Sequence, residues 1–226
     1  MPFTALEEPM LLSAFLACGA RHLTLVNPAY KEDKALNYYD TATRLLLNAL
    51  QDLKNRNMVT CATTAVILNV YEIMSERATQ RMNHIAGARA LIEECGWNAR
   101  SPGIGGACFW LNVSMELLSC LHVNWCLARN PDDWGVDMSL DLEPSLSGGE
   151  EKWAHKIVYI LAKIANFRAT IKPFGSYDMQ NKRYEEWKHL HNLCLAWNDA
   201  IPRSMHPIAY LYPYQTTHKS AFPEVW

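Results

Sequence analysis

The sequence has no excess of charge of either sign. Its 226 residues include 21 Lys plus Arg and 23 Asp plus Glu, which gives a formal net charge of -2 at pH 7. A protein that holds nucleic acid by its phosphates needs a concentrated positive surface. The basic clusters at Lys31–Lys34 and Lys182–Arg183 are too thin to supply one. We therefore expect no direct binding to DNA.

Long hydrophobic runs are also missing. A membrane-spanning helix needs about 20 apolar residues, whereas stretches without Asp, Glu, Lys or Arg, such as 57–71 and 101–115, are 15 residues long. Glu7 and Glu8 precede the apolar run 10–20, where a secretory signal peptide carries positive charge. We expect neither a membrane partner nor a signal peptide.

The cysteines form no C-x-x-C pair, and seven is an odd number. Scattered cysteines in a chain of this size are typical of free thiols in a reducing compartment. Two sets of residues are candidate metal ligands: His191 with Cys194, and Cys120, His122 and Cys126. His191 and Cys194 share a helix face but have no third or fourth ligand nearby, and Cys120, His122 and Cys126 are spread around their helix. We therefore predict no metal site.

Sequence motifs for catalysis and for nucleotide binding are absent as well. The glycines of 103–106 lack the spacing of a nucleotide loop, no Lys-Ser or Lys-Thr follows, and we interpret this stretch as a plain loop. No G-x-S-x-G nucleophile motif occurs. Asn112-Val113-Ser114 fits a glycosylation pattern but lies in an apolar helical stretch, so we expect no modification. We predict no catalytic residue and no cofactor.

The sequence does contain helical periodicity almost throughout, with apolar residues recurring at three- and four-residue steps. Seven helices are expected, near residues 8–25, 31–54, 60–75, 79–94, 110–128, 150–171 and 180–200. The segment 60–75 is apolar nearly all round, which predicts a central, buried helix. Gly96 suits a left-handed helix end. The fold class is therefore all-α, a single-domain array of about seven antiparallel helices.

The last residues differ from the rest of the chain. We place a helical domain over residues 1–201 and an irregular, aromatic- and proline-rich tail over residues 202–226. The tail aromatics have no periodic partner, which suggests a loosely held segment that wraps over another surface. They are Tyr210, Tyr212, Tyr214, Phe222 and Trp226.

Tryptophan is unusually frequent, with eight residues. Five of them are expected on helices, mostly on the apolar faces: Trp110, Trp125, Trp153, Trp187 and Trp197. They either fill the core or line a cavity between helices that accepts an apolar small molecule. Gly87 lies inside a predicted helix, where glycine costs about 1 kcal/mol relative to alanine; this predicts close packing of a neighbouring helix. We interpret His84 as a buried hydrogen-bonding residue.

An ordered set of short motifs resembles the fungal-specific transcription factor domain, the helical regulatory region downstream of a fungal binuclear zinc cluster. The most specific motif is 84–92, His-Ile-Ala-Gly-Ala-Arg-Ala-Leu-Ile. The others are segments 16–23, 38–42, 68–72, 109–110, 197–202 and 222–226, with Trp134 and Trp153. The last of these segments, Phe-Pro-Glu-Val-Trp, is similar to an FPEIW-type sequence of the family.

The chain also departs from the family pattern. Its cysteines lack the spacing of the six-cysteine zinc cluster that binds DNA in the family, and residues 112–116 lack an Arg-x-Asp pattern. We expect the chain to be short at both ends relative to family members. The resemblance supplies no catalytic site to carry over.

The resemblance implies a nuclear fungal transcription regulator that is not an enzyme and controls a metabolic or secondary-metabolite gene set. Its expected partners are proteins, either the transcription machinery or a DNA-binding factor, and an apolar small-molecule effector. The alternative is a small pocket enzyme, of isomerase or cyclase type, with His84, His122 or Glu116 as acid or base. That enzyme needs a large tryptophan-lined cavity with one of these residues pointing inward. A third hypothesis is a scaffold of paired helices without a ligand.

Overall fold

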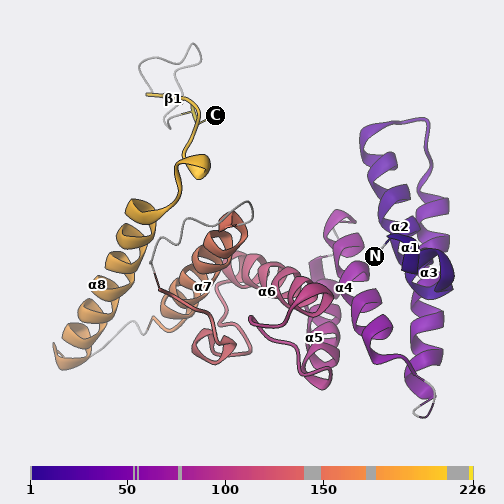
Figure 1. Ribbon diagram of the computed structural model, residues 1–226, viewed down its shortest axis with the longest axis horizontal. Helices are drawn as coiled ribbons and strands as arrows, with labels where there is room; N and C mark the ends of the chain where they lie inside the picture. Colours follow the sequence, from indigo (N-terminus) through magenta and orange to yellow (C-terminus); the bar gives the residue numbers. More distant parts are fainter. Residues whose placement is uncertain are drawn as a thin grey trace. The chain divides into compact units, whose positions relative to one another are not determined.

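The fold is all-α, as the sequence predicts, in a computed structural model that describes residues 2–52, 54, 56–75, 78–139, 149–171, 177–212 and 224–225 (Figure 1). Within these residues there are eight α-helices, close to the seven expected. They are α1 (Pro2–Glu7), α2 (Pro9–Val26), α3 (Glu32–Gln51), α4 (Met58–Met74), α5 (Ala78–Glu94), α6 (Gly103–Val123), α7 (Gly149–Ala169) and α8 (Tyr177–Ala200). Two 3-10 turns follow α6 and α8, η1 (Pro131–Trp134) and η2 (Arg203–Met205).

The chain forms two compact units. Unit 1 comprises Met1–Val136 with Ala165–Ile171, and unit 2 comprises Asp137–Ile164 with Lys172–Trp226. The predicted division into a domain over 1–201 and a tail over 202–226 stays a prediction.

In unit 1, α4 is the central helix, as its apolar composition predicts. It packs against α2, α3, α5 and α6, and Figure 1 shows it between α3 and α5. Eleven of its 17 residues are buried. Asn57 caps its first turn, because the side-chain oxygen accepts the Thr60 N–H at 3.2 Å.

The helices α2 and α3 pack closely because their facing side chains are small. Ala14, Ala17, Ala35 and Ala42 are completely buried. Arg21 then fixes the end of this pair: its guanidinium donates to the Met74 carbonyl at 3.0 Å and to the Glu32 carboxylate at 2.9 Å.

The helix α6 begins earlier than predicted. Gly103, Gly105 and Gly106, interpreted from sequence as part of a loop, form its first turn. A Cβ at Gly105 would lie 2.8 Å from the Trp97 ring, and one at Gly106 would lie 2.2 Å from the Ser101 carbonyl oxygen. These glycines therefore allow the preceding segment to lie against the helix.

The other end of α6 also differs from the prediction. Asn124 adopts a left-handed conformation with φ of 58°, which ends the helix at Val123. Trp125 was expected on an inner helix face, but it lies beyond this end and is 59 % exposed. Arg168 caps the helix by donating to the Leu121 carbonyl at 2.5 Å, and it also donates to the Asn124 side chain at 2.9 Å. The left-handed helix end predicted at Gly96 is confirmed by its φ of 70°.

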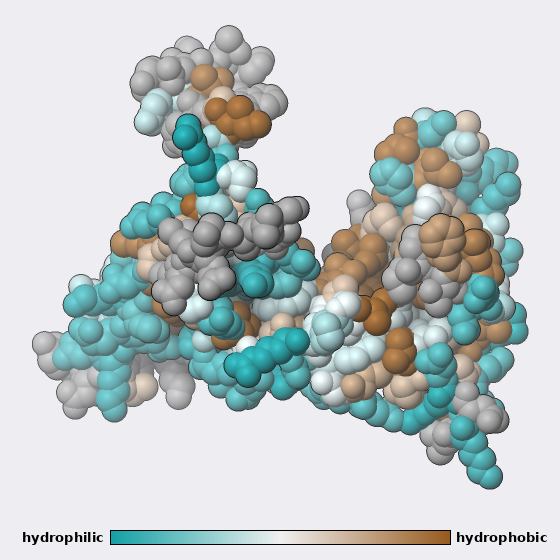
Figure 2. All heavy atoms as spheres, in the orientation of Figure 1, coloured by the Kyte–Doolittle hydropathy of each residue, from teal (hydrophilic) through white to brown (hydrophobic). Residues whose placement is uncertain are grey.

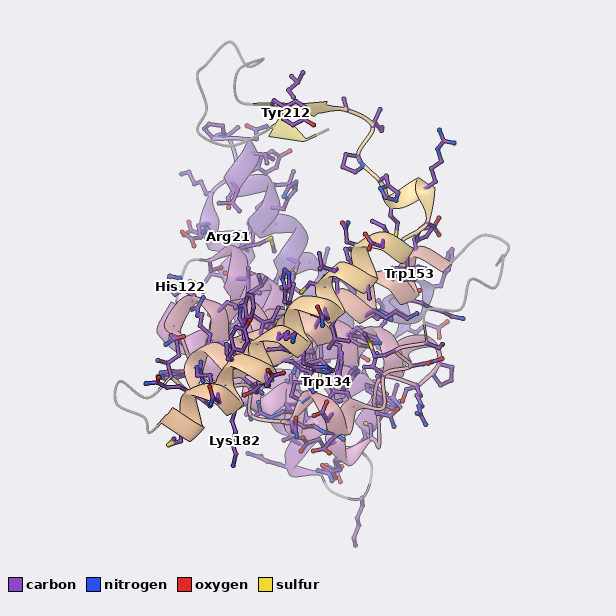
Figure 3. All side chains as sticks on the ribbon, turned by 90° about the vertical axis from the view of Figure 1, so that its left-hand side faces the viewer. Arg21, His122, Trp134, Trp153, Lys182 and Tyr212 are labelled. Carbon is purple, nitrogen blue, oxygen red and sulfur yellow. The ribbon has the colours of Figure 1, made fainter. Side chains whose placement is uncertain are left out.

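Trp110 and Trp134 fill the core of unit 1 around α6. Phe109, Trp110 and Trp134 meet edge to face, with ring centroids 5.3 to 6.2 Å apart. Trp134 is 2 % exposed; its position is labelled in Figure 3. Trp110 therefore fills the core, which is the first of the two roles expected from the sequence.

In unit 2, the indole N–H of Trp197 on α8 donates to the Trp153 carbonyl on α7 at 2.9 Å, and Trp153 is buried. Ser204 in η2 donates to Glu150 at 2.8 Å. The strands β1 (Tyr210–Leu211) and β2 (Glu224–Val225) pair antiparallel. Of the tail aromatics, Tyr214, Phe222 and Trp226 lie outside the described residues, while Tyr212 is half exposed.

Candidate functional site

A groove of about 330 Å³ lies among α3, α4 and α5 of unit 1. Its lining residues are Thr43, Leu46, Leu47 and Leu50 from α3, Ala65 and Leu68 from α4, and Gly87, Ala88 and Leu91 from α5. The α4 residues and Ala88 are buried, whereas Leu47 is 55 % exposed. The buried side chains therefore form the bottom of the groove, and Leu47 lies at its rim.

Helical periodicity explains the α3 wall. Leu46, which is nearly buried, faces the core, while Leu47 and Leu50 continue the apolar surface around the helix. The sequence interpretation did not find this groove, although the consecutive leucines 45–47 make the apolar stripe of α3 wider than one face requires.

Gly87 lies on this groove, and the expectation of a closely packed neighbouring helix there is wrong. A Cβ built at Gly87 would meet no atom within 4 Å. The neighbouring space is instead the groove.

A partly buried ion pair joins α5, which lines the groove, to α6. The Arg89 guanidinium on α5 donates to the Glu116 carboxylate on α6 at 2.9 Å, and the same carboxylate oxygen accepts the Ala128 N–H at 2.9 Å. The Glu116 side chain is 4 % exposed. Arg89 belongs to the 84–92 motif, so this motif contributes a connection between two core helices.

Two further polar contacts join helices inside unit 1. Asn69 on α4 donates to the side-chain oxygen of Asn112 on α6 at 3.1 Å, and both residues are 2 % exposed. Burial of Asn112 agrees with the expectation that it is not glycosylated. The Tyr39 hydroxyl on α3 donates to Glu72 on α4 at 2.5 Å. Burial, and then the neighbouring Glu72 carboxylate, raise the pKa of Tyr39, so this hydroxyl keeps its proton and acts as a donor.

The cavity next to Glu116 is small. It has a volume of about 20 Å³ and is lined by Arg89, Phe109, Asn112 and Trp134 among others, which is the size of one water molecule. The enzyme alternative requires a large tryptophan-lined cavity around an acid or base, and Glu116 does not lie in one. His122 is exposed at the end of α6, and the side chain of His84 lies outside the described ones.

The candidate metal ligands do not converge. Within the described part of the chain, no group of three or more His, Cys, Asp or Glu residues is placed to hold a metal ion. His191 instead stacks on Trp187, which in turn stacks on Tyr184, with ring centroids 5.2 and 5.8 Å apart. All seven cysteines are free thiols. Burial raises the pKa of Cys18 and of Cys120 to about 11, with Glu116 as a second cause at Cys120.

Two of the described helices, α2 and α6, are long and apolar enough to cross a membrane. They are longer than the charge-free stretches of the sequence because each helix includes one charged residue. Arg21 in α2 is paired with Glu32, and Glu116 in α6 is paired with Arg89. Most of α6 is buried in unit 1, as in the core helix of a soluble protein, while 17 % of α2 is buried. The expectation of no membrane partner stays a prediction.

Comparison with known proteins identifies the family. The profile of the fungal specific transcription factor domain matches residues 2–201, which is most of the chain. No curated protein and no solved structure matches.

The chain therefore belongs to the fungal specific transcription factor domain family. This family gives it a transcription-regulator-like role and is generally non-enzymatic.

Proposed function

We propose that this protein is a nuclear transcription regulator of a fungus that acts through protein partners and does not read DNA itself. Family membership supports the regulatory role. The charge distribution supports the absence of direct DNA contact, because the net charge is -2 and the basic clusters are short. Lys182, in one of these clusters, extends from α8 in Figure 3.

The observation that carries the partner role is the number of exposed apolar side chains on α1, on α2 and on the turn after α2. Figure 2 shows hydrophobic side chains gathered over α1 to α4. The exposed large side chains there are Phe3, Leu6, Phe15, Leu16, Leu23, Leu25, Val26 and Tyr30. Exposed apolar surfaces of this kind mark protein interaction sites more often than single exposed side chains do. We propose that a component of the transcription machinery, or a DNA-binding factor, contacts this surface.

A reporter assay tests the proposal. The full chain is fused to a heterologous DNA-binding domain, and transcription of a reporter carrying the matching sites is measured. We expect the fusion to change reporter transcription. The double variant Leu25→Ser with Val26→Ser should lose this effect, because it removes exposed apolar contacts without removing buried ones.

The control is a pair of exposed leucines elsewhere. The double variant Leu118→Ser with Leu195→Ser changes side chains of similar exposure on α6 and α8 and should keep the reporter effect. Equal activity of the two double variants would place the partner contact elsewhere. Binding of the purified chain to duplex DNA more tightly than about 1 μM at physiological salt would contradict the absence of DNA reading.

The nuclear location and the target genes are proposals that rest on the family. A fusion to a fluorescent protein, imaged in a fungal host, tests the location. We propose that the target genes form a metabolic or secondary-metabolite set. Comparison of transcripts with and without the gene tests this, and unchanged transcripts of every biosynthetic gene set would contradict it.

A further inference from the structure

The groove among α3, α4 and α5 has the dimensions of a small-molecule site. Its volume of about 330 Å³ lies in the range of roughly 300 to 1,000 Å³ that is typical of ligand pockets. Leu68 and Ala88 at its bottom are at most 2 % exposed. The bottom of the groove is therefore formed by well-packed side chains.

The chemistry of the lining selects a neutral, apolar ligand. None of the nine lining residues is charged. Thr43 carries the single polar side chain among them, and its hydroxyl oxygen is buried from solvent. The surface offered to a ligand is thus hydrocarbon, and a charged group would lose its hydration there without a partner.

Gly87 lines the groove, and the protein leaves the space beside it open. Glycine inside a helix is less favourable than alanine, and close packing is the usual structural reason to retain it. Here no atom lies within 4 Å of the position a Cβ would occupy. A larger side chain at position 87 would extend into the groove.

The size of the walls favours a small molecule over a docked helix. The lining segments of α4 (65–68) and α5 (87–91) each cover about one turn, roughly 5 Å of helix length. A helix in a groove binds through residues from i to i+7, which span about 10 Å. The α3 wall, from Thr43 to Leu50, has that length, but the α4 and α5 walls are too short for that mode.

We propose that this groove of about 330 Å³ binds a neutral aliphatic molecule with on the order of ten non-hydrogen atoms. The proposal goes beyond the regulatory role and does not depend on it, because binding is measured on the purified chain without a reporter. Binding of a neutral aliphatic molecule together with an inactive reporter fusion would support the groove proposal and contradict the regulatory role.

The test uses 1-decanol and decanoate as probes, which share an alkyl chain and differ in charge. Binding to the purified full chain is followed by the leucine methyl resonances or by titration calorimetry. We expect saturable binding of 1-decanol that shifts resonances of Leu46, Leu47, Leu68 and Leu91, and binding of decanoate weaker by about tenfold or more. Absence of saturable 1-decanol binding would overturn the proposal.

Two pairs of variants locate the site. Gly87→Leu fills the groove, whereas Gly19→Leu places the same side chain at a helical glycine of α2 that is equally free of neighbours and does not line the groove. Leu47→Asp puts a charge at the rim, whereas Leu118→Asp puts it on exposed α6 surface. Circular dichroism and thermal melting confirm folding of all four.

We expect Gly87→Leu and Leu47→Asp to weaken 1-decanol binding by about tenfold or more, with both controls unchanged. Equal affinity of all four variants would overturn the assignment of the site. A dimer that 1-decanol dissociates, and that does not form in the Gly87→Leu variant, would also overturn the proposal. The occupant of the groove would then be a second copy of the chain.

Discussion

Arg89 and Glu116 form an ion pair with Nη1 and Oε1 2.9 Å apart, and that carboxylate oxygen also accepts the Ala128 N–H. One oxygen atom therefore connects α5, α6 and the segment that follows α6. Arg89 comes from the 84–92 motif, and Ile85, Ala88 and Ile92 of the same motif are buried, so this sequence signal of the family contributes to the packing of unit 1.

The first prediction concerns this pair. Arg89→Leu should lower the free energy of unfolding by about 3 kcal/mol, because it leaves the buried Glu116 carboxylate without its counter-charge. Glu116→Leu should cost less for this reason, because the Arg89 side chain is 26 % exposed and water can hydrate it. The Arg89→Leu, Glu116→Leu double variant should cost less than the sum, since no unpaired carboxylate remains. Urea unfolding of the four proteins measures the cycle. Strict additivity would show that the pair does not interact.

The second prediction concerns glycines that differ in their surroundings. Gly106→Ala should destabilise the chain by about 2 kcal/mol or more, because its Cβ would lie 2.2 Å from the Ser101 carbonyl oxygen. Gly19→Ala has free space and should stabilise by about 0.5 to 1 kcal/mol through helix propensity alone. Thermal melting distinguishes the two, and a neutral Gly106→Ala would contradict the close approach.

The helices could be predicted from the sequence because apolar residues recur with helical spacing. Segment 60–75 is apolar on all sides, and α4 is the buried centre of unit 1 as a result. Gly103 to Gly106 were interpreted wrongly as a loop because glycine is the usual residue of turns. Their role depends on Trp97 and Ser101, which reach them only after folding.

The candidate groove could not be predicted, because it depends on which helix sides remain uncovered. Periodicity identifies the apolar face of α3 but not the distance to α5, and the space at Gly87 exists only because no side chain fills it. The same limit applies to Trp125: its helical spacing was correct, but a left-handed residue at Asn124 ended α6 before it.

The third prediction concerns thiol reactivity. Burial raises the pKa of Cys18 and of Cys120 to about 11, so at pH 8 only about one thiol in a thousand is the reactive thiolate. Cys126 is exposed. A short iodoacetamide pulse at pH 8, read by peptide mass spectrometry, should modify Cys126 first and Cys18 and Cys120 last. In urea the difference should disappear; Cys18 modified as fast as Cys126 in the folded chain would contradict the burial.

The fourth prediction concerns His155 on α7. Burial lowers the pKa of its imidazole below 6.5, and Glu151, whose carboxylate oxygen is 3.8 Å from Nε2, partly offsets this. The unfolded chain therefore takes up a proton near pH 6.5 that the folded chain does not, and the free energy of unfolding falls as the pH drops through that value. His155→Gln should remove this part of the pH dependence between pH 8 and pH 5.5, measured by urea unfolding.

The Glu151→Gln variant should increase the pH dependence of stability, whereas His155→Gln should remove it. Without the carboxylate, the pKa of His155 falls further, so the loss of stability between pH 8 and pH 5.5 should be larger than in the unmodified protein. The double variant Glu151→Gln with His155→Gln should then show no greater loss than His155→Gln alone. A pH dependence that Glu151→Gln reduces would mean that protonated His155 is paired in the folded chain, and that its pKa is raised there.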